Sequence, residues 1–146
     1  MIELDETDCL ILNILQRDAR MPLKEIAGQV HMSSPAVSAR ISRMEKCGVI
    51  RGFHAELNPT AIGMNIKAFI NLEVAPDQKE EFYPYIRLCP NVIECNCVTG
   101  DYSMIIEVLF ASTSDLDLFI GKLHRFGRTK TLIVFSTAVE HRGVDL

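Results

Sequence analysis

The spacing of apolar residues changes near residue 50, and this change constrains the fold more than any other feature. Before residue 50, apolar residues recur at intervals of three and four, which is the period of amphipathic helices. After it, they alternate with polar residues over short runs, which is typical of strands in a half-buried sheet. The two patterns in succession predict an α+β fold, with a helical unit followed by a mixed unit.

Three helices are predicted in the first 50 residues. The first follows Asp5, an N-cap candidate with Asp8 three residues later, which is the spacing of a capping box. The second follows Pro22, and the third has Pro35 in its first turn, with a serine before it as the cap. The tight connection between the second and third helices predicts a helix-turn-helix near residues 23–47.

The charge of this segment differs from that of the whole chain. The formal net charge is −4, yet residues 20–54 carry six basic and only two acidic side chains. A phosphate backbone responds to this local basic block rather than to the average. A plain three-helix packing unit with a solvated charged face is the alternative, but the tight turn and the serine-rich outer face favour DNA binding.

The outward face of the third helix supplies the candidate DNA contacts. Short side chains there allow close approach to the major groove, and Arg43 has the length to reach a guanine or a phosphate. Arg40 lies nearer the packed edge, so it could hold a phosphate or an internal acid, or read a base. Arg51, on a short ribbon expected over residues 49–57, is a candidate for a phosphate contact from a wing. The full candidate set is Ser33, Ser34, Pro35, Ser38, Ala39, Arg40, Ser42, Arg43 and Arg51.

The second half predicts a βαββαβ order. Its expected elements are a strand over 66–74, a helix over 77–89, strands over 92–99 and 102–110, a helix over 112–126 and a strand over 131–139. This order pairs as a ferredoxin-like sandwich, with four antiparallel strands and two helices. We therefore expect a helix-turn-helix domain at 1–50, a wing and linker at 51–64, and a ferredoxin-like domain at 65–146.

The Gly100-Asp101 turn between two expected strands has the parts of an amino-acid site. Asp101 could bind an ammonium group, Tyr102 could stack or donate a hydrogen bond, and the backbone amides of the turn could hold a carboxylate. Ordinary hairpin chemistry explains the same residues. Ser136, expected on the last strand, either reaches this pocket or is an ordinary sheet residue.

Other classes of function find less support. The sequence has no phosphate-cradling glycine loop, nucleophile motif or catalytic carboxylate pair, so we expect no enzymatic activity and no cofactor. Cys95 and Cys97 share a strand face without further ligands at metal-binding spacing, so no metal is expected. An odd number of cysteines, an acidic N-terminus and the lack of a bilayer-length apolar run predict a cytoplasmic protein.

Several motifs together carry a resemblance to a known family. In chain order they are Leu4-Asp5-x-x-Asp8, Met32-Ser33-Ser34-Pro35-Ala36-Val37-x-x-Arg40-Ile41, Met44-Glu45-x-x-Gly48-Val49-Ile50, Asn58-Pro59-x-x-Ile62-Gly63 and Thr99-Gly100-Asp101-Tyr102. Each motif is weak alone, but in this order and spacing the chain resembles the Lrp/AsnC, or feast/famine, transcription regulators over essentially its whole length.

The resemblance implies a winged helix-turn-helix joined to a ferredoxin-like effector domain. It also implies a homodimer, often assembled to an octamer, that binds double-stranded DNA and an amino acid near the turn Thr99, Gly100, Asp101, Tyr102 and Ser103, often between dimers. Ser103 departs from the family pattern, in which an acidic residue commonly follows the tyrosine. This difference could weaken recognition of an ammonium group, change the ligand or remove the response.

The sequence thus predicts a sequence-specific DNA-binding transcription regulator modulated by a small effector such as an amino acid. Two alternatives stay open at this stage. One is a small-ligand-binding or interaction module without specific DNA recognition. The other, disfavoured because no acid–base pair converges, is an enzyme of amino-acid metabolism.

Overall fold

The computed structural model describes residues 3–146, which form two compact units. The first contains the chain up to Glu56 together with Val139–Leu146, and the second contains Leu57–Ala138. The domain boundaries given above stay a prediction, whereas the structure groups the last eight residues with the helices. Each unit is described by itself.

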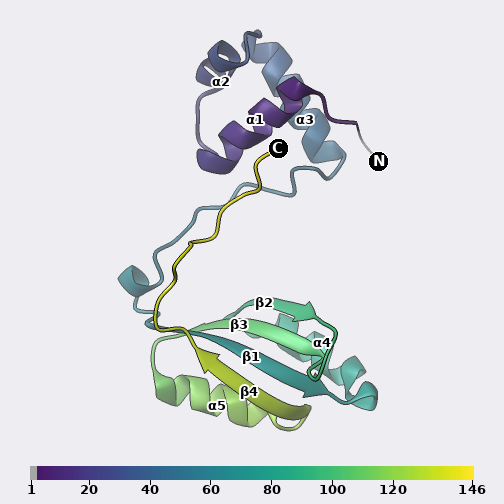
Figure 1. Cartoon of the computed structure of the whole chain (residues 1–146), viewed down its shortest axis with the longest axis vertical. Helices are drawn as coiled ribbons and strands as arrows, with labels where there is room; N and C mark the ends of the chain where they lie inside the picture. The colour runs from purple at the N-terminus through teal and green to yellow at the C-terminus, as the bar shows by residue number, and fades with distance from the viewer. Residues whose placement is uncertain (1–2) are drawn as a thin grey trace. The chain divides into compact units, whose positions relative to one another are not determined.

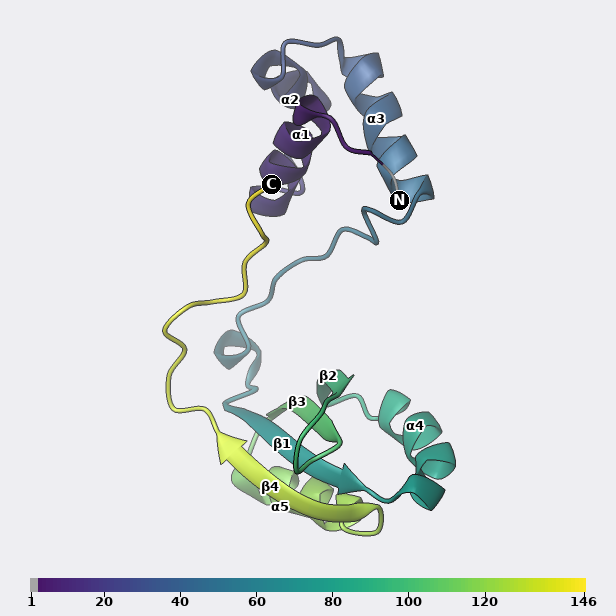
Figure 2. The same cartoon turned by 45° about the vertical axis from the view of Figure 1, so that its right-hand side comes forward.

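The first unit contains three helices: α1 (Glu6–Arg17), α2 (Leu23–Gln29) and α3 (Ser34–Lys46) (Figures 1 and 2). The predicted capping box is present at the start of α1, where the Asp8 amide donates to Asp5 Oδ1 at 2.8 Å and the Asp5 amide donates to Asp8 Oδ2 at 3.2 Å. Ser33 caps α3, since its hydroxyl accepts a hydrogen bond from the Ala36 amide. Buried apolar residues hold the helices together: Ile11, Leu12, Ile26, Ala27, Val30, Val37 and Met44.

The connection between α2 and α3 is as tight as predicted. His31 has a left-handed backbone with φ of 53°, and the Met32 amide donates to the Ala27 carbonyl at 2.9 Å. This hydrogen bond is typical of a helix that ends in a Schellman motif. The turn therefore ends α2 sharply, and α3 begins at Ser34.

The strand expected over residues 49–57 is wrong for the single chain. The structure assigns neither helix nor strand to residues 51–58. The described part of the chain pairs no second strand with this segment, and an unpaired strand leaves its backbone groups without partners. Arg51 lies in this irregular, exposed stretch.

The C-terminal residues pack on α1 within the first unit. The Asn13 side chain exchanges two hydrogen bonds with the Leu146 backbone, at 3.0 and 3.2 Å. Gln16 donates to the Val144 carbonyl at 2.9 Å. A segment that follows the last strand of the second unit thus forms part of the first unit.

The second unit has the predicted ferredoxin-like order. Its strands are β1 (Ile66–Val74), β2 (Val92–Cys97), β3 (Met104–Phe110) and β4 (Gly127–Ile133), and its main helices are α4 (Lys79–Arg87) and α5 (Thr113–Leu123). Two short 3-10 helices, η1 (Thr60–Ile62) and η2 (Pro76–Gln78), precede β1 and α4. The strands pair antiparallel in the order β2-β3-β1-β4.

Both helices of this unit contribute to one core against the sheet. Alternate residues of β1 and β3 are buried and meet apolar residues of α4 and α5, including Phe82, Ile86, Leu116, Phe119 and Leu123. The opposite face of the sheet is therefore left without a helix from the described chain.

The last strand differs from its predicted position of 131–139. β4 begins at Gly127 and ends at Ile133, so it starts four residues earlier. Gly127 lies so close to β1 that a Cβ atom there would be 1.7 Å from the Glu73 carbonyl oxygen. The early part of β4 is polar, which is why its apolar pattern was too weak to mark the start of the strand.

None of the helices in residues 3–146 has the length and apolarity needed to cross a membrane.

Candidate DNA-binding helix and ligand-binding turn

The outer face of α3 presents the short side chains that the sequence predicts. Pro35, Ala39 and Ser42 are exposed, as is the N-cap Ser33. Ser34 and Ser38 are half-buried. These residues lie on one helix with no bulky side chain among them, so the face suits close approach to a flat or grooved partner such as the major groove.

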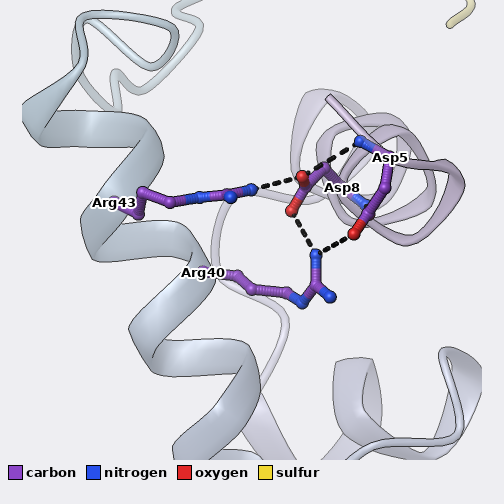
Figure 3. A network of polar contacts seen from close by, with 4 residues as sticks. All are labelled: Asp5, Asp8, Arg40 and Arg43. Atoms are coloured by element: carbon purple, nitrogen blue, oxygen red, sulfur yellow. Dashed lines mark hydrogen bonds and ion pairs between the residues drawn. The ribbon is translucent and has the colours of Figure 1, made fainter. Parts of the chain in front are cut away.

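Arg40 is directed toward α1. Its Nη1 atom donates to Asp5 Oδ2 at 2.7 Å and to Asp8 Oδ1 at 2.8 Å, and its side chain is only 26% exposed (Figure 3). The sequence leaves three partners open for Arg40: a phosphate, an internal acid or a base. The structure shows an internal acid as its partner.

Arg43 also bonds to the same carboxylate. Its Nη2 atom donates to Asp8 Oδ2, while the Asp8 side chain is 1% exposed (Figure 3). Arg43 itself is 45% exposed, so the guanidinium lies at the surface but is tied to α1. Of the three arginines predicted to contact DNA, the two on α3 are therefore engaged within the protein.

Hydrogen bonds from these arginines control the acid–base behaviour of the network. The hydrogen bond from Arg40 lowers the pKa of Asp5. Burial alone would raise the pKa of Asp8, but hydrogen bonds from Arg40, the Asp5 amide and Arg43 outweigh it, so the pKa is lowered. The pKa of Arg40 is raised by its hydrogen bonds to the two carboxylates. All three groups thus stay charged at neutral pH.

Sequence reasoning missed the ionic role of the two aspartates. Asp5 and Asp8 were identified only as a capping box, which needs nothing beyond local spacing. Their partners are 32 to 35 residues away along the chain. Two acids near the start of α1 and two arginines spaced three apart on α3 were the available signal.

Two other basic residues of the first unit are available to attract phosphate. Lys46, at the end of α3, and Arg51 are exposed. No ion pair among residues 3–146 involves either side chain. They are therefore available for contacts that position the protein without reading sequence.

The turn between β2 and β3 keeps its candidate residues accessible. Thr99, Gly100 and Asp101 are exposed, while Tyr102 and Ser103 are half-buried. Gly100 has φ of 111°, a conformation that side chains disfavour, although a Cβ atom there would meet no atom within 4 Å. The glycine is thus required by the backbone conformation rather than by crowding.

The hydroxyl and the backbone amide of Ser103 are both hydrogen-bonded to β1. Its hydroxyl accepts from the Val74 amide at 2.9 Å and donates to the Leu72 carbonyl at 3.3 Å. Its backbone amide also donates to Leu72, at 3.2 Å. The Ser103 side chain thus links the turn to the end of β1. Of the Asp101 and Ser103 side chains, that of Asp101 is therefore the one accessible to a ligand.

Two residues that sequence reasoning missed lie beside this turn. Arg128 on β4 forms an ion pair with Glu73 on β1, with 3.2 Å between nitrogen and oxygen. The Arg128 guanidinium also lies 5.2 Å from the centre of the Tyr102 ring. A cation, an acid and an aromatic ring are therefore grouped at one end of the sheet, a relation that depends on the β1–β4 register.

The structure does not bring Ser136 to this turn. Residue 136 is exposed and follows β4, whose end at Ile133 pairs with Ala68. The turn lies at the other end of β1, near Leu72 and Val74. Ala68 and Val74 are about 20 Å apart along the strand, so within one chain Ser136 and the turn are at opposite ends of the sheet.

The cysteines and histidines of the described residues form no metal-holding cluster. Residues 3–146 contain no group of three or more metal-ligating side chains placed to hold an ion. Cys95 is half-buried, and burial raises the pKa of its thiol, whereas Cys97 is exposed.

Comparison with protein families gives two matches that together cover most of the chain. Residues 4–45 match the model of the AsnC-type helix-turn-helix domain. Residues 67–144 match the model of the Lrp/AsnC ligand binding domain.

Curated relatives match over nearly the full length. The chain is 33% identical over 140 residues to the HTH-type transcriptional regulator FL11 of Pyrococcus furiosus, covering 94% of this chain and 93% of the relative. It is 30% identical over 132 residues to the HTH-type transcriptional regulator LrpA of Bacillus subtilis, covering 90% of this chain and 97% of the relative.

Solved structures share the fold. The feast or famine regulatory protein of M. tuberculosis in complex with L-methionine superposes with a TM-score of 0.92 at 28% identity, covering 99% of this chain and 100% of that protein. A transcriptional regulator of Neisseria meningitidis, also in complex with L-methionine, gives a TM-score of 0.89 at 26% identity, covering 99% of this chain and 96% of that protein.

Proposed function

The chain belongs to the Lrp/AsnC family of DNA-binding transcription regulators, and from this premise we propose that α3 binds operator DNA while an amino acid bound near residues 99–103 modulates that binding. The observation that carries the proposal is the exposed face of short side chains on α3, a helix that a tight turn and a capped N-terminus place in a helix-turn-helix. The protein acts, on this proposal, together with DNA in the cytoplasm and catalyses no reaction.

In this proposal, different residues of the first unit contact the bases and the phosphates of the DNA. Ser34, Ser38 and Ser42 face the bases, because short hydroxyl side chains accept and donate at base edges in the major groove. Ser33, Pro35 and Ala39 permit the close approach. Arg51 and Lys46 neutralise phosphates, while Arg40 and Arg43 support the helix from behind.

The turn from Thr99 to Ser103 supplies the effector site in this proposal. Asp101 holds the ammonium group of an amino acid, and the exposed backbone of Thr99 and Gly100 faces its carboxylate. Arg128 and Tyr102 lie beside them and close the site on the sheet side. Two structural neighbours were solved with L-methionine, which supports an apolar amino acid as the class of ligand.

The uncovered face of the sheet supports a homodimer. Phe69, Ile105 and Leu109 are half-buried on this face, and Leu132 is 49% exposed. A second copy that covers these residues with its own sheet would bury them as sheets do in a sandwich. A dimer presents two α3 helices, so its sites would be palindromic with half-sites about one helical turn apart. Further assembly to an octamer is part of the proposal.

A DNA-binding titration tests the function. Duplexes selected by the wild-type protein from a random-sequence library are titrated by fluorescence anisotropy at several salt concentrations, with and without each amino acid. Ser42→Glu places a negative charge on the DNA face and is expected to weaken specific binding about tenfold or more. Ser114→Glu, at an exposed position of α5, makes the same charge change and is expected to bind as wild type.

The two variants separate the proposal from its alternative. If the protein is an interaction module without specific DNA recognition, the library yields no preferred sequence and both variants bind alike. If an amino acid modulates binding, at least one of the titrations with amino acid shifts the midpoint.

A further inference from the structure

We propose that Asp8 is a positioning residue that acts through Arg40 and Arg43: it fixes α3 on α1 and keeps both guanidinium groups away from DNA phosphates. This inference rests on the DNA-binding part of the proposed function and adds a determinant of specificity. The residue does not touch DNA, and its effect is to favour the operator over other sequences.

The first support is the geometry of the carboxylate. Asp8 is the one buried charged or polar residue among the core residues of the described chain. Its oxygens accept from the Asp5 amide at 3.2 Å, from Arg40 Nη1 at 2.8 Å and from Arg43 Nη2. No buried side-chain nitrogen or oxygen in residues 3–146 lacks a partner. The carboxylate therefore links the N-terminus of α1 to two points, three residues apart, on α3 (Figure 3).

The second support is the spacing on α3. Residues three apart lie on neighbouring turns of one helix face, so two bonds to one fixed acceptor restrict rotation of the helix about its axis. A rotation of α3 would change which of Ser38, Ala39 and Ser42 faces outward. Asp8 thus determines the face that α3 presents, although it lies on another helix.

The third support is the balance of charge. Asp5 and Asp8 carry two negative charges, and Arg40 and Arg43 carry two positive charges, so the network is neutral as a whole. A guanidinium already bonded to a carboxylate gains little by also binding a phosphate. Non-specific attraction to DNA then depends on residues outside the network, such as Lys46 and Arg51.

The test compares Asp8→Asn with the wild-type protein on two duplexes, one selected by the wild type and one scrambled. Removal of the charge frees Arg40 and Arg43 for phosphates. Each additional phosphate that the protein neutralises steepens the slope of log affinity against log salt concentration by about 0.9. We expect the slope on scrambled DNA to steepen by about 0.9 to 1.8, and the preference for the selected duplex to fall about fivefold or more.

Three matched variants make this result specific. Glu45→Gln changes the charge by the same amount at an exposed position of α3, where Glu45 makes no ion pair with residues 3–146, and is expected to change the slope less than Asp8→Asn does. Asp5→Asn keeps a capping oxygen because asparagine caps as well as aspartate, and is expected to give a smaller effect than Asp8→Asn. In an Arg40→Gln, Arg43→Gln background, Asp8→Asn is expected to leave the slope unchanged, because its partners are gone.

If circular dichroism shows that Asp8→Asn does not fold, Arg43→Gln keeps the proposal testable. Under the proposal Arg43 binds no phosphate or base, so the slope of this variant stays at the wild-type value. A slope that flattens by about 0.9 would mean that Arg43 leaves Asp8 to contact DNA, and the proposal would be overturned.

The outcomes also separate this inference from the proposed function. If the wild-type protein selects no preferred sequence, the proposed function fails. If it does, and Asp8→Asn has the slope and preference of Glu45→Gln, only the positioning role of Asp8 is refuted.

Discussion

Glu73 and Arg128 face each other across the β1–β4 ladder, with a carboxylate oxygen of Glu73 3.2 Å from a guanidinium nitrogen of Arg128. The same guanidinium lies 5.2 Å from the centre of the Tyr102 ring. The Arg128 and Glu73 side chains are 65% and 53% exposed, so solvent screens the pair and it contributes little to stability. Under the proposed function, this exposed pair beside the turn Thr99–Ser103 takes part in ligand binding.

Replacement of Arg128 by alanine is therefore expected to weaken the amino-acid response. Loss of a charged group beside the bound ligand would raise the effector concentration needed for half-maximal effect about tenfold, while DNA binding without effector stays unchanged. The measurement is a titration of DNA affinity with amino acid. Lys130→Ala, also exposed on β4, is the matched control, and an equal effect of the two variants would contradict a role for Arg128.

Asp101→Ala is expected to abolish the influence of the effector and to leave basal DNA affinity intact. Asp101 is exposed on the turn and forms no ion pair within residues 3–146, so its loss has no evident cost to folding. The same titration measures this outcome. An unchanged response to amino acids would rule out the turn as the effector site.

Ser103→Ala is expected to act on stability rather than on ligand binding. The substitution removes the hydroxyl that accepts from the Val74 amide and donates to the Leu72 carbonyl. The free energy of unfolding should fall by about 1 kcal/mol or more, because a partly buried amide loses its partner. Thermal or urea unfolding followed by circular dichroism gives this value, with the exposed Ser114→Ala as the reference. A loss of effector affinity with unchanged stability would show that Ser103 binds the ligand.

Gly127→Ala is expected to destabilise the second unit by about 3 kcal/mol or more. A Cβ atom would lie 1.7 Å from the Glu73 carbonyl oxygen, and neither backbone can move without breaking the β1–β4 pairing. Gly121→Ala is a suitable contrast, since a Cβ atom on this exposed helical glycine meets no atom within 4 Å. That change should stabilise the protein by about 0.5–1 kcal/mol. Equal unfolding midpoints for the two variants would contradict the close contact.

The first unit is expected to lose stability in acid. The pKa values of Asp5 and Asp8 are lower in the folded protein than their ordinary value of 3.8. The folded state therefore binds fewer protons than the unfolded state. The stabilisation is present above the unfolded pKa and is lost as the pH falls through the folded pKa. Unfolding measured between about pH 6 and pH 2 should show this decrease, and Asp8→Asn should make it shallower; an equally steep decrease in the variant would refute the assignment.

Local patterns were sufficient to predict most elements of the fold. Ile66–Val74 is a strand with the predicted bounds, because apolar residues occupy every second position through its full length. The capping box at Asp5 and the cap at Ser33 were visible for the same reason, since each depends on residues three apart. The predicted start of β4 is wrong because the first five residues of the strand, from Gly127 to Thr131, include no large apolar side chain.

The candidate sites depend on contacts between residues that are far apart in the sequence, and local patterns do not reveal such contacts. The bonds of Arg40 and Arg43 to Asp8 require the packing of α3 against α1. The neighbourhood of Arg128 and Tyr102, and the separation of Ser136 from the turn, require the register of β4 on β1. The expected ribbon over 49–57 failed because a strand needs a partner, and the described chain provides none for it.

The hydrogen bonds that Asn13 and Gln16 make to the last residues affect how this protein can be divided experimentally. A recombinant fragment that stops at Glu56 would contain all three helices but would expose the surface of α1 that Val144 and Leu146 contact. A protease that cuts after β4 would likewise detach a segment from the helical unit without touching a helix. The helical unit is therefore more than the segment before Glu56, and its intact form includes Val139–Leu146.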